Sequence, residues 1–552
     1  MPDSTPSRRR LLTASLALGA GAATSFTLPS LLDRPTETGR VLHSRAPLPK
    51  PFQVPLPIPP VLRPTSTEGG IDRYRITQRA SRAELLPDGL TTPLWGYDGI
   101  FPGPTIVSRR GRTTVVRHRN ELPVPTVVHL HGGRTPADSD GYPTDLLLPA
   151  PDAAHRRTDP HAQHHGRTPQ KTGHGGEPNR HGQGTGPHAP DPRAHLTRGS
   201  REYTFPLDQP AATLWYHDHR MDFTAPAIYR GLAGFHLVRD DIEDALPLPH
   251  GERELPLMIA DRAFAADGSF DYPSLDPELH TTPGVREEFT GGVLGDVILV
   301  NGAPWPEHEV TATRHRLRIL NGSNARRYHL ALDPPPPGGG AFRQIGADQG
   351  LLAAPRDHDT LPTGPAERHD VVVDFGRYPV GSTVTLVNRL GSGGTRQVMR
   401  FRVTRRAADD SHVPRRLAEI EPLHRSQATV TREFAFQAGQ VHGRPGWLIG
   451  RRPFAPDRIE ARPQLGAVEL WRFVADAHHP VHLHLVGFQI LARGNGRRPG
   501  PHDAGVKDTV HLRPGESTEV IARFDGYRGR FLFHCHNAEH EDMAMMANFE
   551  VV

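Results

Sequence analysis

FLFHCHNAEHEDMAMM, residues 531–546, is the most informative stretch of this 552-residue sequence. It opens with apolar, β-prone residues and then places Cys535, the one cysteine of the chain, between His534 and His536. Neighbouring side chains on a strand point to opposite faces, so the thiol must face away from the two flanking imidazoles. One strand therefore presents ligands to two separate sites.

Three further His-x-His triplets occur: His129-Leu130-His131, His217-Asp218-His219 and His482-Leu483-His484. With 34 histidines in the chain, chance alone would produce roughly two such triplets, so their surroundings must carry the argument. Residues 126–128, 214–216 and 531–533 are strongly β-prone and precede three of the four triplets. On a strand, residues i and i+2 share a face about 6.6 Å apart, so each triplet presents two imidazoles side by side. We expect all eight imidazoles to converge on a group of metals.

Cys535 has the partners that a blue-copper centre needs, namely two imidazoles and a weak axial thioether. His540 lies five residues later, Met545 ten residues later, and His479 opens HPVHLH at 479–484. The alternative is that a lone buried cysteine and nearby methionines only pack a core. The flanking histidines and the HPVHLH stretch favour the metal site.

Most of the chain has the pattern of an all-β protein. Helical periodicity is scarce, whereas short β-prone runs such as 113–117, 297–300, 371–375 and 383–387 alternate with turn residues. The 57 prolines and 55 glycines fit sandwiches or barrels of many short strands.

A weak internal repeat predicts three β domains. Segments 103–122, 300–324 and 448–479 each place a turn, a polar strand and an apolar strand in similar order. Polar stretches near 245 and 412 supply boundaries, so we expect domains at 45–240, 245–410 and 412–552.

Residues 151–198 differ from the rest of the chain. Pro, Gly, Arg and His dominate and apolar residues are nearly absent, which predicts a disordered surface insertion in the first domain. Its histidines could scavenge copper; the other interpretation is a solvated loop of biased composition.

The N-terminus predicts export. Ser7-Arg8-Arg9-Arg10-Leu11-Leu12 precedes an alanine-rich apolar run, and Ala20-Gly21-Ala22 is a small-residue cleavage site. Residues 1–44 are therefore interpreted as a twin-arginine signal and linker, for a periplasmic or extracellular protein; an ordinary basic start is the alternative. No later stretch is apolar enough for a membrane span. A net charge of only +4 argues against a nucleic-acid surface, and the sequence does not indicate an oligomeric state.

The stretches HLHG (129–132), WYHDH (215–219), HPVHLH (479–484) and HCHNAEHEDMAM (534–545) resemble the four copper-binding motifs of multicopper oxidases. Their order is similar to that of the three-domain form, which implies three cupredoxin-like Greek-key β-barrel or sandwich domains. WGYDGIFPGPTI (95–106), DSDG and GLAGFHLV (231–238) resemble the branch holding spore-coat laccase, bilirubin oxidase and phenoxazinone synthase.

The resemblance implies four coppers per chain. His479, Cys535 and His540 would bind a type 1 copper with Met545 as axial ligand, and His129 and His482 a type 2 copper. The type 3 pair would be held by His131, His217, His219, His484, His534 and His536. Asp140 and Glu541 match positions where such relatives keep proton-delivering carboxylates. Their alternatives are a turn aspartate and a solvent-facing acid.

The activity implied is that of a laccase: one-electron oxidation of small phenols or aromatic amines at type 1 copper, through the edge of His540, and reduction of O2 to water at the trinuclear cluster. Copper nitrite reductase is a weaker alternative, because it needs no type 3 pair. A cuprous-ion oxidase or a copper-sequestering copper-tolerance protein is a further alternative. Only seven methionines are present, without the methionine-rich segment that cuprous oxidases use.

Overall fold

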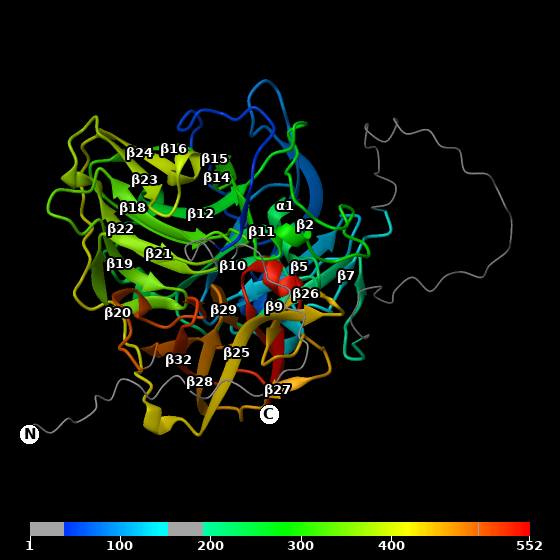
Figure 1. The fold of residues 1–552 in the computed structure, drawn as a ribbon. Helices are drawn as coiled ribbons and strands as arrows, with labels where there is room; N and C mark the ends of the chain where they lie inside the picture. The colour runs from blue at the N-terminus through cyan, green and yellow to red at the C-terminus, as the bar shows by residue number, and fades with distance from the viewer. Residues whose placement is uncertain (1–37, 153–190, 495) are drawn as a thin grey trace, which may run out of the picture. The chain divides into compact units, whose positions relative to one another are not determined.

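The structure, a computed structural model, describes residues 38–152, 191–494 and 496–552. Strands form most of its regular structure, so the predicted all-β class is confirmed (Figure 1). Its α-helices within these ranges are Thr224–Arg230 (α1), Asp241–Asp244 (α2) and Ala538–Asp542 (α3). No helix among the described residues is both long and apolar enough to cross a membrane. The twin-arginine motif lies outside the described residues.

Two sheets between residues 71 and 239 form the first sheet pair, and they share a core that includes Tyr74 and Ile106. One sheet contains, in order, Gly103–Arg109 (β4), Ala233–Arg239 (β11), Ala212–Asp218 (β10) and Val128–His131 (β6). The other contains Thr92–Tyr97 (β3), Ile71–Ala83 (β2), Thr113–Asn120 (β5) and Ser200–Phe205 (β9). A short parallel pair, Leu147–Leu148 (β7) and Thr197–Arg198 (β8), packs against β9.

The second sheet pair, between 254 and 405, encloses the core around Leu317 and Phe401. Its larger sheet contains Ala303–Pro304 (β15), Val297–Val300 (β14), Glu254–Arg262 (β12), Arg314–Asn321 (β17), Arg368–Asp374 (β22), Phe342–Ala347 (β19) and Gly350–His358 (β20). The other contains Glu307–Thr311 (β16), Gln397–Arg405 (β24), Thr383–Asn388 (β23), Tyr328–Asp333 (β18) and Thr360–Thr363 (β21).

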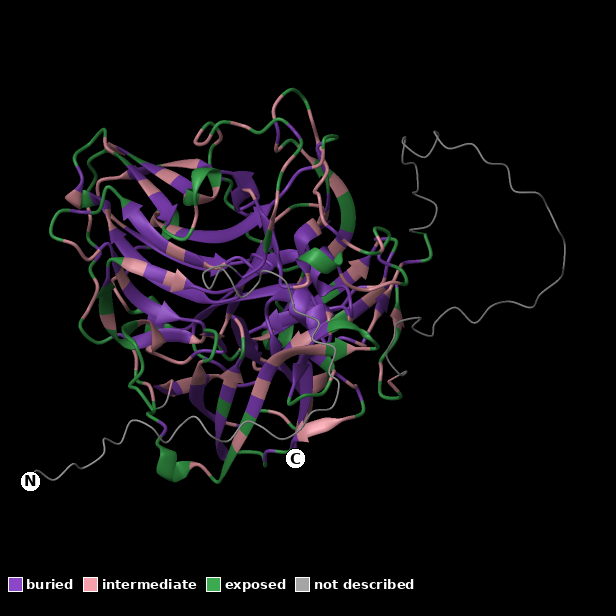
Figure 2. Cartoon of the chain, viewed as in Figure 1, coloured by how far each residue is buried: buried purple, intermediate pink, exposed green. Residues whose placement is uncertain are grey.

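The third sheet pair, between 430 and 551, encloses the core around Phe473 and Phe533. One sheet contains Arg444–Ile449 (β26), Val430–Val441 (β25), Val468–Ala475 (β28), Ser517–Arg523 (β32) and Phe488–Arg493 (β30). The other contains Ile459–Ala461 (β27), Met546–Val551 (β34), Gly529–Cys535 (β33), His479–Leu483 (β29) and Thr509–Leu512 (β31). Most strand residues in the three pairs are buried (Figure 2).

The same strand pairing recurs in all three sheet pairs. Parallel neighbours are β2 and β5, β12 and β17, and β25 and β28 in one sheet of each pair. In the other sheet they are β4 and β11, β16 and β24, and β27 and β34. Each predicted repeat segment contains two consecutive strands that belong to different sheets of its pair, namely β4 and β5, β16 and β17, and β27 and β28, so the sequence repeat reflects a repeated topology. The domain boundaries near 245 and 412 remain predictions.

Residues 40–56 precede the first sheet pair in sequence, but they run alongside residues 293–307 of the middle of the chain. Arg40–Leu42 (β1) pairs in parallel with Val293–Gly295 (β13), Phe52 N–H donates to the carbonyl of Trp305, and Leu56 N–H donates to that of Glu307. Residues that the sequence assigns to a linker and to the first domain are therefore hydrogen-bonded to the predicted second domain.

The end of the predicted insertion is ordered. Asp191 accepts hydrogen bonds from Arg530 at 2.7 and 3.1 Å and from Thr144 at 2.7 Å, and residues 197–198 form β8. The prediction of disorder over 151–198 is therefore wrong for residues 191–198, because ion pairing and strand pairing replace the missing apolar core. Residues 153–190 lie outside the described residues.

A buried ion network joins the first two sheet pairs. Glu243 on α2 accepts hydrogen bonds from Arg316 at 2.9 Å and Arg318 at 2.8 Å, both on β17, and Asp370 on β22 accepts one from Arg316 at 2.9 Å. Burial alone would raise the pKa of Glu243, but Arg318 and Arg316 hold it below its ordinary value. Arg318 also donates to the hydroxyl of Thr213 on β10 at 2.9 Å, so the network links strands of the first two sheet pairs.

Candidate metal centres

The His-x-His triplets lie at the ends of four strands that pair two by two, with His219, His484 and His536 one residue past β10, β29 and β33. In the first sheet pair β6 runs antiparallel to β10, which places His129 opposite His217. In the third, β29 runs antiparallel to β33, which places His482 opposite His534. Both registers bring one triplet beside another.

The eight imidazoles converge, as the strand geometry predicts. Ring centroids within a triplet are 5.8 Å apart for His129 and His131, and 4.8 Å apart for His482 and His484. Across the two sheet pairs the rings are closer, with His129 stacked on His484 at 3.9 Å and His131 on His482 at 3.6 Å. The remaining four, His217, His219, His534 and His536, lie against the same group. These eight residues are called the trinuclear group below, after the three-copper cluster that the sequence resemblance implies.

The nitrogen pattern of this group fits a metal. Ring nitrogens without a hydrogen-bonding partner among the described residues are Nε2 of His129, His131, His217 and His482, Nδ1 of His219 and both nitrogens of His536. Backbone carbonyls of Asp140, Asp218 and Asp508 lie against Nδ1 of His129, His217 and His482. Such a contact assigns the proton to Nδ1 and leaves a lone pair on Nε2, as a metal ligand requires.

The electrostatics of the group point the same way. Burial, together with repulsion from neighbouring histidines, lowers the pKa of His129, His131 and His536 well below its ordinary value. These three imidazoles are therefore neutral at pH 7. Buried polar atoms without partners destabilise a fold unless something binds them, and imidazole suits copper.

A second group lies on the opposite face of β33. The sulfur of Cys535 is 3.4 Å from Nδ1 of His479 and 3.6 Å from Nδ1 of His540, and these two nitrogens are 3.2 Å apart. The other nitrogens are held, since Nε2 of His479 contacts Asp476 at 3.0 Å and Nε2 of His540 contacts the Gly291 carbonyl at 3.1 Å. These three residues are called the mononuclear group below.

The thiol of the mononuclear group needs a cation to ionise. Burial raises the pKa of Cys535 well above its ordinary value, and the backbone N–H of Asn537 donates to its sulfur at 3.4 Å. A bound soft metal deprotonates such a thiol outright. Met545 is buried beside this group: Cys535 N–H donates to its carbonyl, and its own N–H donates to the carbonyl of His540. Its axial role remains a prediction.

Both predicted carboxylates touch the trinuclear group. Asp140 Oδ2 is 2.8 Å from Nδ1 of His484, and burial raises the pKa of Asp140 to about 8. Glu541 Oε2 is 3.2 Å from Nδ1 of His534. Burial alone would raise the pKa of Glu541, but His534 and His219 hold it below its ordinary value. Neither side chain is exposed, so the solvent-facing alternative for Glu541 is wrong.

Sequence reasoning missed Asp508 and Arg368. Asp508 Oδ1 is 3.6 Å from Nδ1 of His131, and the Asp508 carboxylate binds both terminal nitrogens of Arg368 from β22. Arg368 Nη1 is also 3.3 Å from Nδ1 of His131. The sequence signal was weak, because a lone Asp before one strand and an Arg on another become neighbours only in the fold.

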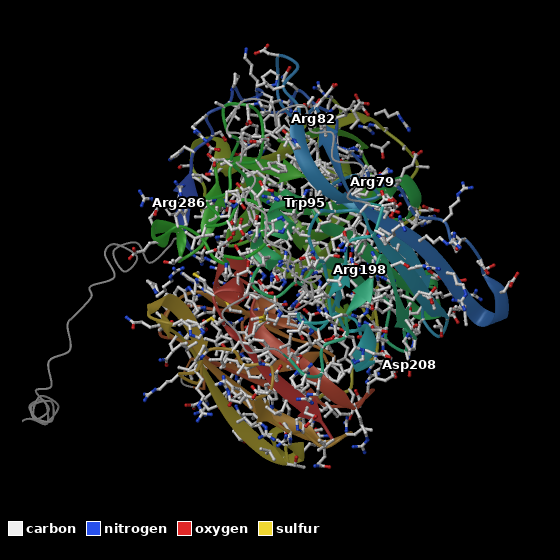
Figure 3. The ribbon with its side chains drawn as sticks, turned by 90° about the vertical axis from the view of Figure 1, so that its right-hand side faces the viewer. Arg79, Arg82, Trp95, Arg198, Asp208 and Arg286 are labelled. Atoms are coloured by element: carbon white, nitrogen blue, oxygen red, sulfur yellow. The ribbon has the colours of Figure 1, made fainter. Side chains whose placement is uncertain are left out.

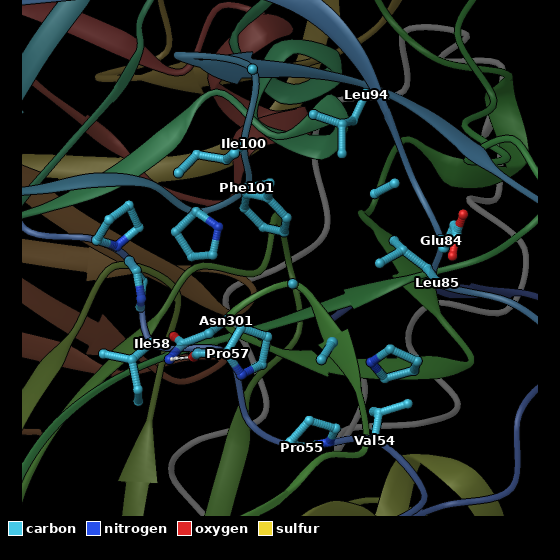
Figure 4. A pocket seen from close by; sticks show the side chains of 18 of the residues that line it. Val54, Pro55, Pro57, Ile58, Glu84, Leu85, Leu94, Ile100, Phe101 and Asn301 are labelled. Atoms are coloured by element: carbon cyan, nitrogen blue, oxygen red, sulfur yellow. Dashed lines mark hydrogen bonds between the residues drawn. The ribbon is translucent and has the colours of Figure 1, made fainter.

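A cavity of about 450 Å³ lies apart from both groups (Figure 4). Segment 54–60, the end of β2 and residues 99–102 and 301–304 line it, with Ile58, Leu85 and Phe101 among its apolar walls. Its lining includes none of the predicted copper ligands, and Asn301 uses its amide to bind the carbonyl of Pro57 at 2.9 Å.

Residues 79–154 with 174–243, and residues 423–552, match two family profiles that are both described as multicopper oxidase. The sequence is 34% identical to a laccase from Bacillus subtilis (strain 168), over 90% of this chain and 97% of that protein. It is 34% identical to a bilirubin oxidase from Albifimbria verrucaria, over 90% and 81%. A laccase crystal structure from Pediococcus acidilactici has a TM-score of 0.74 at 30% identity, covering 93% of this chain and 96% of that one.

Proposed function

The chain belongs to the multicopper oxidase family, and on that premise we propose that its reducing substrates are phenols or aromatic amines, oxidised one electron at a time. It is a laccase-like copper oxidoreductase that uses O2 as electron acceptor, and it has the cupredoxin fold of its structural neighbours.

The side chains present fit four coppers. The mononuclear group, with Met545 as axial ligand, would hold type 1 copper, and His129 and His482 would hold type 2 copper. The type 3 pair would be held by His131, His217, His219, His484, His534 and His536. When bound, copper supplies the one-electron redox chemistry that amino-acid side chains lack.

The observation that carries this proposal is the arrangement on β33. Cys535 belongs to the mononuclear group, whereas the adjacent His534 and His536 belong to the trinuclear group. One peptide unit on each side of Cys535 therefore connects a site that collects single electrons with a site that can store several. Pooling electrons in this way lets O2 be reduced to water without release of partly reduced oxygen.

Protons must reach a site that is closed to solvent. Asp140 and Glu541 are positioned for this task, because each places a carboxylate oxygen against a histidine of the trinuclear group. Asp140 would hold and release a proton at Oδ2, and Glu541 at Oε2. Reduction of O2 to water takes up one proton for each electron, and the contacts of these two carboxylates with His484 and His534 support their role in supplying those protons.

The alternatives receive less support. A nitrite reductase needs no type 3 pair and leaves the eight-imidazole group unexplained. The relatives named above do not favour a cuprous-ion oxidase over a laccase. A copper-sequestering role depends on the histidine-rich insertion, most of which lies outside the described residues; deleting it should leave phenol oxidation intact.

The decisive variant is Cys535→Ser. We expect it to fold and to lose both the blue absorption and oxidase activity, because its hydroxyl does not replace a thiolate ligand. Copper-loaded wild type should in parallel be assayed with a methoxyphenol, 2-aminophenol, bilirubin and Cu(I). A blue Cys535→Ser protein would contradict the copper assignment, and a preference for Cu(I) would contradict the substrate class.

We also propose that the protein is exported folded through the twin-arginine route and works in the periplasm or outside the cell. The support is the Arg8-Arg9 pair and the small-residue site at 20–22. Replacing both arginines by lysine should retain the protein in the cytoplasm, as fractionation would detect; unchanged export would contradict the route.

A further inference from the structure

Trp447 covers the mononuclear group. Its ring stacks on the imidazole of His540 with centroids 3.7 Å apart and planes inclined by 26°, and it meets His479 edge-on at 5.4 Å. The indole N–H donates to the carbonyl of Thr290 at 2.9 Å, and the backbone N–H donates to that of Met543 at 3.1 Å. These bonds fix the ring against both histidines.

The histidines themselves are closed to solvent. His540 is 2% exposed and His479 is 0% exposed, whereas Trp447 is 8% exposed. The Nε2 edge of His540, the expected contact for a donor, faces the carbonyl of Gly291 at 3.1 Å and the amide of Asn537 at 3.1 Å. Of these three rings Trp447 keeps the largest exposed fraction, so a donor arriving from the surface meets the indole before either imidazole.

Two exposed segments are connected to Trp447, one that directly precedes it in sequence and one that precedes Thr290, the acceptor of its indole N–H. The tip of the β25–β26 hairpin carries Arg444, and the helical turn before Thr290 carries Arg286, Glu287 and Glu288. Arg286 lies at the surface of the molecule (Figure 3). The charged side chains on these two segments are of both signs, so neither segment repels an uncharged aromatic molecule.

This inference rests on the function proposed above. We propose that Trp447 is the residue on which a neutral phenol or aromatic amine stacks, and that its indole conducts the electron to His540. Rings at stacking distance replace a gap that the electron would otherwise cross through solvent or saturated side chains. Trp447 is thus a substrate contact and a specificity-determining residue.

The electrons and protons of this step balance when O2 is the final acceptor. In each event the phenol would lose one electron and release its hydroxyl proton to water, and the electron would pass through the indole to a copper held by the mononuclear group. The indole ends unchanged. O2, the acceptor of the family, takes up the pooled electrons and an equal number of protons, so no further oxidant is needed.

The variants Trp447→Leu and Trp447→Phe test the proposal, with Trp471→Phe as matched control. Trp471 is buried in the same sheet pair and packs on Phe434 and Phe533 with ring centroids 4.9 and 5.1 Å away. A methoxyphenol should be compared with hexacyanoferrate(II), a one-electron donor that does not stack. In Trp447→Leu we expect the methoxyphenol KM to rise about fivefold relative to the KM for hexacyanoferrate(II), as loss of one aromatic stack implies, while kcat falls with both donors because the indole no longer conducts and the blue absorption is unchanged. Trp447→Phe should keep a methoxyphenol KM close to that of the wild type.

A second readout needs neither copper nor turnover. Nitrobenzene, a neutral aromatic quencher, should quench tryptophan emission of the metal-free protein saturably in wild type and Trp471→Phe, and this component should vanish in Trp447→Phe. Equal quenching in Trp447→Phe and Trp471→Phe would overturn the proposal, even if Trp447→Leu fails to bind copper. So would a methoxyphenol KM in Trp447→Leu that is unchanged or lower. Copper-loaded wild type that oxidises no phenol would instead refute the proposed function, which the quenching titration does not address.

Discussion

Replacing Asp508 by Asn separates the role of its carboxylate from that of its carbonyl. The carboxylate accepts hydrogen bonds from Arg368, from the Gln349 amide at 2.7 Å and from the Thr509 hydroxyl at 2.9 Å. The backbone carbonyl accepts a hydrogen bond from Nδ1 of His482 at 2.9 Å. Asn keeps the carbonyl and the shape of the side chain, but it removes the charge that faces Arg368.

Two magnitudes follow from this geometry. Removing one partner of a buried ion pair destabilises a protein by about 3–5 kcal/mol. The cost here should lie near the lower end, about 3 kcal/mol, because Asp348 remains 3.8 Å from Arg368 and Asn still accepts a hydrogen bond. Arg368 also contacts His131 at 3.3 Å, so a displaced guanidinium disturbs a ligand at the same time. Loss of a residue that orients metal ligands typically weakens metal binding by about 10- to 100-fold.

The assay is copper content per chain after dialysis against a graded chelator series, with electron paramagnetic resonance of the type 2 signal and the blue absorption read on the same samples. We expect Asp508→Asn to lose copper from the trinuclear group first and to stay blue. Asp503→Asn is the matched control, because Asp503 binds Arg493 through two hydrogen bonds, at 2.7 and 3.2 Å, in the same sheet pair. Wild-type copper affinity and an unchanged type 2 signal in Asp508→Asn would refute the reasoning.

Three other outcomes are expected. Met545→Leu should keep the blue colour and raise the type 1 reduction potential, measured by redox titration, because an axial ligand tunes the site; an unchanged potential removes Met545 from that role. Glu243→Gln should lower the free energy of unfolding by about 3 kcal/mol in guanidinium titrations and leave copper spectra unaltered, since it breaks the buried network with Arg316 and Arg318; an unaffected midpoint would argue against that network. Burial lowers the pKa of His118 to about 3, whereas the unfolded chain binds this proton below a pH of about 6.5. The free energy of unfolding therefore decreases as the pH is lowered from about 6.5 to about 3. His118→Phe should flatten this acid-side decline in melting temperature, and an equally steep decline would contradict the linkage.

The sequence predicts which candidate ligand side chains come together because the relevant geometry is local. A two-residue period places His534 and His536 on one face of β33 and Cys535 on the other, whatever packs against that strand. The repeat at 103–122, 300–324 and 448–479 is likewise local, and it reappears as the same parallel strand pairings in each sheet pair. The insertion shows the limit of composition: residues 191–198 are ordered by Arg530, which is distant in sequence.

What surrounds the ligands could not be predicted, because it depends on which strands of different sheet pairs meet. Arg368 reaches His131 only because β22 of the second sheet pair packs beside β6 of the first and the loop before β31 of the third. The cover of His540 likewise combines Gly291, Trp447 and Asn537, which no periodicity connects. The expectation that a donor touches the His540 edge followed from ligand positions alone. That edge is buried and Trp447 keeps the larger exposed fraction, so the candidate copper ligands follow from local pattern, whereas the residues proposed to select the donor follow from tertiary packing.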